Sequence, residues 1–316
     1  MTEPARYIRD LGSGLFLTAY SVDPSISASK LVEIVSGKDR TSKFDLDALS
    51  KDVAFKGRID SFSGLNVSAT REQYQVPEQL QAYREALQSK LDSEGKFNGP
   101  VAVIKGGLEK DLSLCRGGYY DFMATKLEVV PGNLVPDQYL AGQTVEELMP
   151  QWEMSNDQRA RYFALAFVML PSDGREFSFV QRAPGLGIAP DCISTTGSTP
   201  GFNEGFFESG FDFARYYEAE ITKEMGEEYG LNPDEFRITG ANLIDDIRTV
   251  PHTAVEITTP LTTQELATRI HGKKEAIAEH PVIYSIKPEA IPIFLERFDV
   301  WPSVQFVMSK FHEQRR

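Results

Sequence analysis

Apolar residues recur at two different spacings in the first half of the chain. Between residues 77 and 95 they recur every three or four positions, which predicts an amphipathic helix that begins near Pro77 and ends near Gly95. Short apolar runs at residues 31–35 and 100–105 have the length and the β-branched content of strands. The first half of the chain is therefore expected to mix helices with strands.

The second half of the chain alternates apolar runs with one long amphipathic stretch. The uninterrupted apolar run at residues 161–171 predicts a buried strand, and residues 175–183 predict a second strand after a turn at Gly174. Residues 211–231 predict the most clearly defined helix. Further strands are expected at 237–248, 253–261 and 281–286, and further helices at 262–272, 288–298 and 302–312. This order indicates an α/β or α+β fold class.

A polar, proline-containing stretch at residues 141–158 separates these two halves. Because domain boundaries fall in such linkers, we expect a boundary near residue 155. The prediction is a smaller N-terminal α/β domain at residues 1–155, followed by a second domain at residues 156–316.

Composition narrows the class of protein. The chain has 316 residues, of which 41% are hydrophobic and 25% are charged, as in globular proteins, and no run of eighteen apolar residues occurs. No secretory signal is recognised at the start, and Cys115 and Cys192 are too few for a disulfide framework, so a cytoplasmic protein is expected. The net charge of −13 disfavours nucleic acid as a partner. We expect a small-molecule partner and no membrane partner, and the oligomeric state is left open.

The stretch "KEMGEEYGL", residues 223–231, places three glutamates within five residues of the expected helix: Glu224, Glu227 and Glu228. At helical periodicity the glutamates form an acidic stripe beside an apolar one, with Glu228 at the border and therefore partly buried. Two interpretations follow. The glutamates form either a solvated helix face or the ligands of a hard divalent cation such as Mg²⁺ or Mn²⁺.

The same stretch resembles the second half of the Nudix hydrolase signature, which reads Arg-Glu-aliphatic-x-Glu-Glu-x-Gly-aliphatic. The match is complete except that Lys223 replaces the arginine. The resemblance implies that residues 156–316 form an α/β/α sandwich with a mixed sheet. It also implies a metal-dependent pyrophosphohydrolase that uses Mg²⁺ or Mn²⁺, in which Glu224, Glu227 and Glu228 bind metal or assist the attacking water.

The first half of the Nudix signature departs from the family pattern, because the upstream glutamate aligns with Arg215. Glu208 or Glu204 would replace it if the glycine-rich loop at residues 197–210 is an insertion, and Glu208 is taken as a further metal ligand. Lys223 also provides only a point charge, whereas the family's arginine has a planar guanidinium that can form paired hydrogen bonds. The alternative function is therefore a catalytically weak or inactive Nudix-fold protein that binds a nucleotide-like ligand.

A second resemblance concerns substrate. Residues 98–126 are similar to a segment of the two-domain Nudix proteins that resemble UDP-glucose pyrophosphatases. That resemblance implies cleavage of a nucleoside diphosphate linked to another moiety, a nucleotide sugar being one candidate, into a nucleoside monophosphate and a phosphorylated product.

Several polar residues are candidates for binding that substrate. Arg182, at the end of an expected strand, either contacts a phosphate or is a surface cation. Tyr119, Tyr120, Asp121 and Thr125 either line a nucleoside or sugar pocket or have core or surface roles. Asp245, Asp246 and Arg248 end an expected strand, and they either reach the same cleft or are the ordinary charges of a turn. Cys192 is interpreted as a buried strand residue rather than a nucleophile.

Overall fold

The computed structural model describes most of the chain, in segments. They are residues 3–37, 53–93, 95, 98–105, 108, 111–125, 129–130, 133–134, 160–183, 193–208, 210–246, 252–298 and 300–314. The strands are β1 Arg6–Gly12, β2 Leu15–Ser21, β3 Val53–Ile59, β4 Asn66–Gln73, β5 Pro100–Lys105, β6 Asp111–Gly118, β7 Val129–Val130, β8 Asn133–Leu134, β9 Ala164–Leu170, β10 Phe177–Gln181, β11 Ile193–Ser194, β12 Thr196–Ser198, β13 Arg237–Asp246, β14 His252–Thr258 and β15 Val282–Ile286. The α-helices are α1 Ala28–Ser36, α3 Glu78–Ser93, α4 Tyr119–Thr125, α6 Pro171–Gly174, α7 Phe213–Tyr229, α8 Thr263–Ile270, α9 Lys274–Glu279, α10 Ile291–Arg297 and α11 Pro302–Gln314, and the 3₁₀ helices are η1 Phe62–Gly64, η3 Glu204–Phe207 and η4 Pro288–Ala290.

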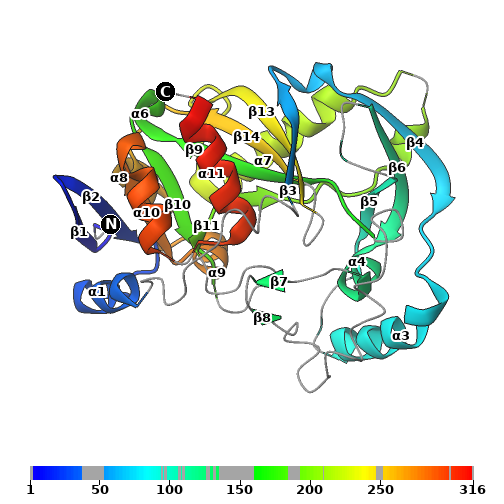
Figure 1. Ribbon diagram of the computed structural model, residues 1–316, viewed down its shortest axis with the longest axis horizontal. Coiled ribbons are helices and arrows are strands. Elements are labelled where there is room, and N and C mark those ends of the chain that lie inside the picture. Colours follow the sequence, from blue (N-terminus) through cyan, green and yellow to red (C-terminus); the bar gives the residue numbers. More distant parts are fainter. Residues whose placement is uncertain are drawn as a thin grey trace.

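The central feature is a large mixed sheet with strand order β1-β2-β15-β10-β9-β14-β13-β3 (Figure 1). Strand β11 pairs with β10, and β12 pairs with β9. All of these neighbours are antiparallel except β14 and β9, which run parallel. The mixed α/β fold class predicted from the sequence is confirmed.

Helices cover both faces of this sheet. Along β9, Leu165 and Phe167 point into the core that also contains α7 and α8. Val168 and Leu170, further along the same strand, point into the opposite core, which also contains residues of α1, α10 and α11. This alternation follows from the period of two along a strand, and it leaves β9 buried on both faces. The helix α7 is thereby fixed against the middle of the sheet.

A smaller three-stranded sheet, in the order β4-β6-β5, lies beside α3 and α4 (Figure 1). The residues that lead into β9 run alongside β5, where the N–H of Ile104 donates to the carbonyl of Arg161 at 2.7 Å. The N–H of Phe163 likewise donates to the carbonyl of Ala102 at 3.2 Å. The backbone therefore connects the small sheet to the large one.

The predicted domain boundary near residue 155 lies outside the described residues. Strands from both sides of that position build the large sheet, since β2 pairs with β15 and β3 pairs with β13. The N-terminal segment up to Ile59 therefore contributes three strands to the sheet that supports α7.

Most element types agree with the pattern predictions, and one does not. The expected strand at residues 31–35 is wrong, because these residues belong to α1. The Ser27 side chain caps this helix by accepting from the N–H of Lys30, and Leu31 and Val35 are buried one turn apart. The strand preference of the β-branched residues in this run is therefore weaker than the combined effect of the helix cap and of burial at helical spacing.

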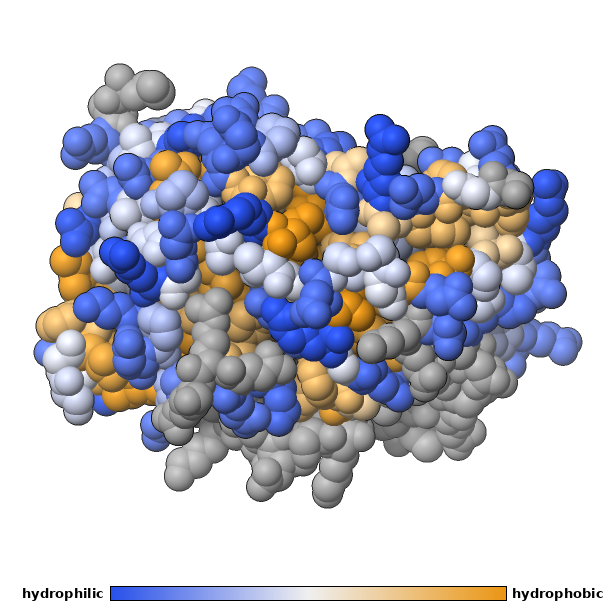
Figure 2. Space-filling view, turned by 90° about the horizontal axis from the view of Figure 1, so that it is seen from above, coloured by the Kyte–Doolittle hydropathy of each residue, from blue (hydrophilic) through white to orange (hydrophobic). Residues whose placement is uncertain are grey.

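On the face shown in Figure 2, hydrophilic residues surround smaller apolar patches. Among the described residues, the large hydrophobic side chains with the greatest exposure are Ile8, Val32, Phe16 and Phe55. Within the described part of the chain, no helix combines the length and the apolar character needed to cross a membrane.

Candidate functional site

The helix α7 carries the glutamates of "KEMGEEYGL" on defined faces. It begins after Asp212, whose side chain accepts from the N–H of Arg215, and it ends at Gly230, which has a left-handed conformation. Tyr217, Ile221 and Met225 are buried against the sheet. The carboxylates on the remaining faces are therefore held in register along the helix.

Three of these carboxylates surround one lysine. The Lys223 Nζ lies 3.2 Å from Glu224, 3.6 Å from Glu220 and 3.7 Å from Glu227. The Ser198 hydroxyl, at the end of β12, is within 3.3 Å of an oxygen of both Glu220 and Glu224. Helical spacing in the sequence already places Glu220 on the same acidic stripe, one turn before Glu224. Sequence reasoning gave Glu220 no functional role and did not identify Ser198.

Glu228 faces the interior, as its border position predicted, and only 6% of it is exposed. Its Oε1 lies 3.4 Å from the Nε2 of His280, which also lies 3.8 Å from the Oε2 of Glu279. Glu228, Glu279 and His280 each offer one ligand atom, and these atoms lie within 4.8 Å of one another. The Oε2 of Glu228 makes no hydrogen bond of ordinary geometry with the described residues.

Sequence reasoning did not identify Glu279 and His280, which lie more than fifty residues from Glu228 in the chain. Glu279 is the last residue of α9, and His280 follows it as the C-cap before β15. The carbonyl of Glu279 accepts from the N–H of Ala183 at 2.9 Å, which ties this turn to the end of β10. In the sequence, these two residues are only a glutamate followed by a histidine before an expected strand. Nothing in that pattern indicates contact with a residue of α7.

Arg182, also at the end of β10, lies beside this group. It is partly buried, and it makes no hydrogen bond or ion pair with any residue that the structure describes. Burial lowers the pKa of its guanidinium, whereas Glu279 and Glu228 act in the opposite direction. Tyr162 and Tyr119, from the side of the small sheet, also lie within electrostatic range of Arg182.

Burial shifts the pKa values of the acids in this group upward. Burial raises the pKa of Glu228 to about 8, although the Thr196 hydroxyl and Arg182 partly offset it. Burial and then the neighbouring Glu228 raise the pKa of Glu224 to about 7, with Lys223 acting against them. The pKa of His280 is lowered to about 3, chiefly by burial and then by Arg182, so its imidazole is neutral at pH 7.

The predicted substrate-binding residues on α4 are all buried, and their polar atoms have partners within the fold. The Tyr120 hydroxyl donates to Asp92 at 2.9 Å, and the Asp121 carboxylate accepts from Arg84 at 2.9 Å. The Thr125 hydroxyl accepts from the N–H of Ala160 at 2.9 Å. These contacts hold α4 in position, and the role in substrate binding stays a prediction.

The structure does not bring Glu208 to Glu228. Glu208 is exposed and follows η3, and α7 lies between the two residues, which separates them by roughly 20 Å along the helix axis. Glu204 forms an ion pair with Arg116 at 2.8 Å, away from the site. Arg215 is exposed near the start of α7.

Asp245 lies on β13 and forms a buried ion pair with Arg161. The side chains of Asp246 and Arg248, and Cys192 as a whole, lie outside the described residues. Cys115 is buried as a free thiol.

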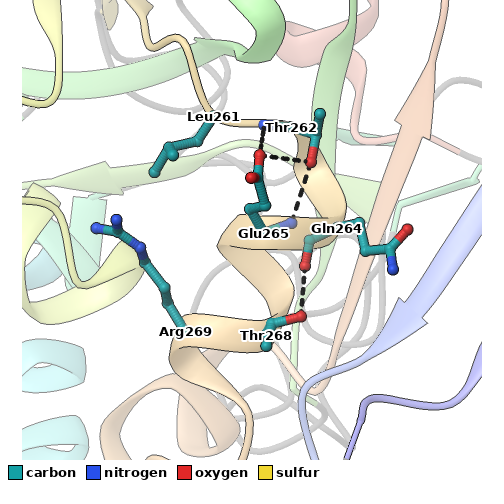
Figure 3. A pocket seen from close by; sticks show the side chains of 6 residues that line it. All are labelled: Leu261, Thr262, Gln264, Glu265, Thr268 and Arg269. Carbon is teal, nitrogen blue, oxygen red and sulfur yellow. Dashed lines mark hydrogen bonds between the residues drawn. The ribbon is translucent and has the colours of Figure 1, made fainter.

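A pocket of about 520 Å³ is lined by residues of α8 and of the turn before it (Figure 3). Its polar groups are engaged locally, since Thr262 and Glu265 form a capping box and the Thr268 hydroxyl donates to the Gln264 carbonyl. Arg269 makes two 2.6 Å contacts with Glu235. These satisfied groups stabilise the ends of α7 and α8 and indicate no ligand.

Comparison with known proteins adds little to this geometry. No protein-family model matches the chain, and no curated protein matches it. Among solved structures, DR0079 from Deinococcus radiodurans aligns with a TM-score of 0.33 and 13% identity, covering 47% of this chain and 81% of that chain. A TM-score of that size does not establish a shared fold.

Proposed function

We propose that the protein is a metal-dependent, Nudix-type pyrophosphohydrolase that cleaves a nucleoside diphosphate linked to another moiety. The observation that carries the proposal is the convergence of the α7 carboxylates and the end of β10. Glu228 meets Glu279 and His280 there, Glu224 lies within electrostatic range of Glu228, and Arg182 adds a guanidinium without a protein partner among the described residues.

The residues present fit a divalent cation. Glu228 is buried with one oxygen lacking a hydrogen bond, and such a carboxylate is costly in the interior unless a positive charge compensates it. Glu224, Glu227 and Glu228 are the residues that would hold Mg²⁺ or Mn²⁺, since hard cations take carboxylate oxygens. When bound, the cation would neutralise charge that develops on the phosphate oxygens.

The protein's own residues would do the rest of the work. Arg182 is positioned to bind a phosphate oxygen, because guanidinium groups recognise phosphates by paired hydrogen bonds. Water attacks one phosphorus, the bond to the bridging oxygen breaks, and a carboxylate accepts the proton of the water. Glu224 either shares the cation or accepts that proton.

The test is hydrolysis of a panel of nucleotide sugars, dinucleotides and nucleoside triphosphates with Mg²⁺ or Mn²⁺, followed by phosphorus NMR. We expect turnover of at least one diphosphate-linked nucleotide and a loss of at least about 100-fold in Glu228→Gln, the scale of removing one electrostatic group from a transition state. Glu218→Gln, an exposed glutamate of the same helix, is the matched control and should retain full turnover. Equal turnover in Glu228→Gln and wild type would refute the assigned site.

A second candidate function is a Nudix-fold protein that binds a nucleotide-like ligand without cleaving it. The observation that favours it is the position of Lys223, whose ammonium already lies among three of the carboxylates. This candidate predicts thermal stabilisation by a nucleotide with no product after long incubation.

A further inference from the structure

We infer that Glu228, Glu279 and His280 form one cation site containing an imidazole nitrogen, which takes a first-row transition metal such as Mn²⁺, Co²⁺ or Zn²⁺ in preference to Mg²⁺. The inference deepens the proposed function and rests on it for the role of the metal in hydrolysis. It goes beyond that function by adding two ligands to the glutamates of α7: the carboxylate at the end of α9 and the histidine that follows it.

The geometry of the three groups suits a shared ion. The Nε2 of His280 lies 3.4 Å from one carboxylate and 3.8 Å from the other, and all three ligand atoms lie within 4.8 Å. Ligand atoms about 2.0–2.2 Å from a common cation are separated by roughly 3–3.5 Å, so only small side-chain adjustments are needed. Glu279, with 48% of its side chain exposed, can make such an adjustment.

The hydrogen bonding of the same groups is incomplete without an ion. A separation of 3.4 Å is long for an N–H···O bond, whose usual length is about 2.9–3.0 Å. The Oε2 of Glu228 and the Nδ1 of His280 are both buried and make no hydrogen bond of ordinary geometry with the described residues, although the Thr196 hydroxyl interacts with Glu228 and the Glu279 backbone with His280. His280 is 1% exposed and Glu228 is 6% exposed, so water does not readily satisfy them.

The ligand set also points to the class of metal. Two carboxylates and one imidazole mix hard oxygen donors with a nitrogen donor that Mg²⁺ accepts poorly and that later first-row metals accept well. A bound cation would lie close to Arg182, which makes this end of β10 more positive and favours an anion between them.

The experiment measures metal binding alone, on the full chain without substrate. Mn²⁺ is titrated into metal-free protein, and pulsed electron paramagnetic resonance reports whether an imidazole nitrogen is coordinated. We expect a nitrogen coupling in the wild type and its loss in His280→Gln. We also expect the dissociation constant for Mn²⁺ to rise at least about tenfold in His280→Gln and in Glu279→Gln, because losing even an outer partner of a metal ligand costs that much. Glu275→Gln, an exposed residue of α9, is the matched control.

Bound Mn²⁺ without nitrogen coupling, or unchanged coupling in His280→Gln, would overturn the inference. If His280→Gln does not fold, the wild-type spectrum decides, together with selective broadening of the His280 ring signals by Mn²⁺ in nitrogen-15 NMR. Hydrolysis is assayed separately. Turnover without nitrogen coupling refutes only this inference, and nitrogen coupling without turnover on any substrate refutes only the hydrolase proposal.

Discussion

At the residue scale, the site depends on one buried carboxylate. Glu228 lies in the interior beside a neutral imidazole, and Arg182 is the cation that partly offsets its burial. Burial raises the pKa of an acid when no positive charge compensates the carboxylate, and a bound cation would lower that pKa again. Glu228 and Arg182 are therefore expected to contribute to different parts of the site, Glu228 to the cation and Arg182 to the phosphate.

Arg182→Met tests the phosphate role. We expect the KM for a diphosphate substrate to rise about 10- to 100-fold, because a hydrogen bond to a charged group contributes roughly 1.5–3 kcal/mol. Steady-state kinetics measures the change. Arg175→Met, an exposed arginine before the same strand, is the control and should leave KM unchanged. An unchanged KM in Arg182→Met would show that the guanidinium does not contact substrate.

At the element scale, α7 holds Glu220, Glu224, Glu227 and Glu228 in register, and the glycine within the helix and the glycine that caps it have opposite roles. Gly230 ends the helix with φ of 66°, and a Cβ there would lie 2.8 Å from the Lys273 Nζ. Gly226 has ordinary helical geometry, is exposed, and meets no neighbour closer than 3.7 Å. The first glycine is required by backbone conformation, and the second is not.

Alanine at these two positions should therefore shift stability in opposite directions. Gly230→Ala should destabilise the fold by about 1–2 kcal/mol, the cost of a left-handed conformation for a residue with a Cβ. Gly226→Ala should stabilise it by about 0.5–1 kcal/mol, because alanine is the better helix former. Urea denaturation measures both, and a shift of the same sign in the two variants would contradict this account.

The end of α7 is also tied to α8 by an ion pair. Arg269 contacts both oxygens of Glu235 and donates to the carbonyl of Gly230 at 3.3 Å. Hydrogen bonds from Arg269, and then from the N–H of Asn232, lower the pKa of Glu235 to about 2. The carboxylate is more acidic in the folded than in the unfolded chain, so its stabilisation is complete above the unfolded pKa near 4.5 and is lost as pH falls toward 2.

Glu235→Gln should consequently melt below the wild type at pH 7, and the difference should shrink as pH falls from about 4.5 toward 2. Melting curves recorded between pH 2 and 7 measure this effect. Asp234→Asn changes an exposed neighbouring residue and is the control, and its melting temperature should follow that of the wild type at every pH. A pH-independent difference for Glu235→Gln would argue against the ion pair as the cause.

Sequence patterns within a few neighbouring residues predicted most of the helices and strands. The site residues that were not predicted depend on contacts between residues far apart in the chain. The periodicity and terminal glycine of α7, and the Thr262 cap of α8, lie within a few neighbouring residues. The burial of Glu228 was also predictable, because helical spacing fixes the face of each side chain. Glu279 and His280 could not be found this way, since only the packing of α9 against α7 and the end of β10 brings them to Glu228.

At the scale of the whole molecule, contacts of Arg161 hold the small and large sheets together. Arg161 pairs with Asp245 of β13, and its carbonyl accepts from Ile104 of β5. Both side chains of the ion pair are buried. Breaking a buried pair by removing one partner leaves an uncompensated charge, which is strongly destabilising.

Arg161→Met should accordingly destabilise the protein by about 3–5 kcal/mol. Adding Asp245→Asn should recover part of that loss, because no uncompensated carboxylate remains. Equilibrium unfolding in urea compares the two variants. A double variant no more stable than Arg161→Met would mean that Arg161 acts through its other contacts instead of through Asp245.

The central claim is that the carboxylates of α7 hold divalent cations beside Arg182, and crystals soaked with Mn²⁺ test it most directly. Anomalous scattering locates the ions without reference to activity. The account predicts anomalous peaks within ligand distance of Glu228 and of Glu224 or Glu227, which should disappear in Glu228→Gln. Peaks only at other acidic surfaces, or an undisturbed Lys223 cluster with no ion near Glu228, would contradict it.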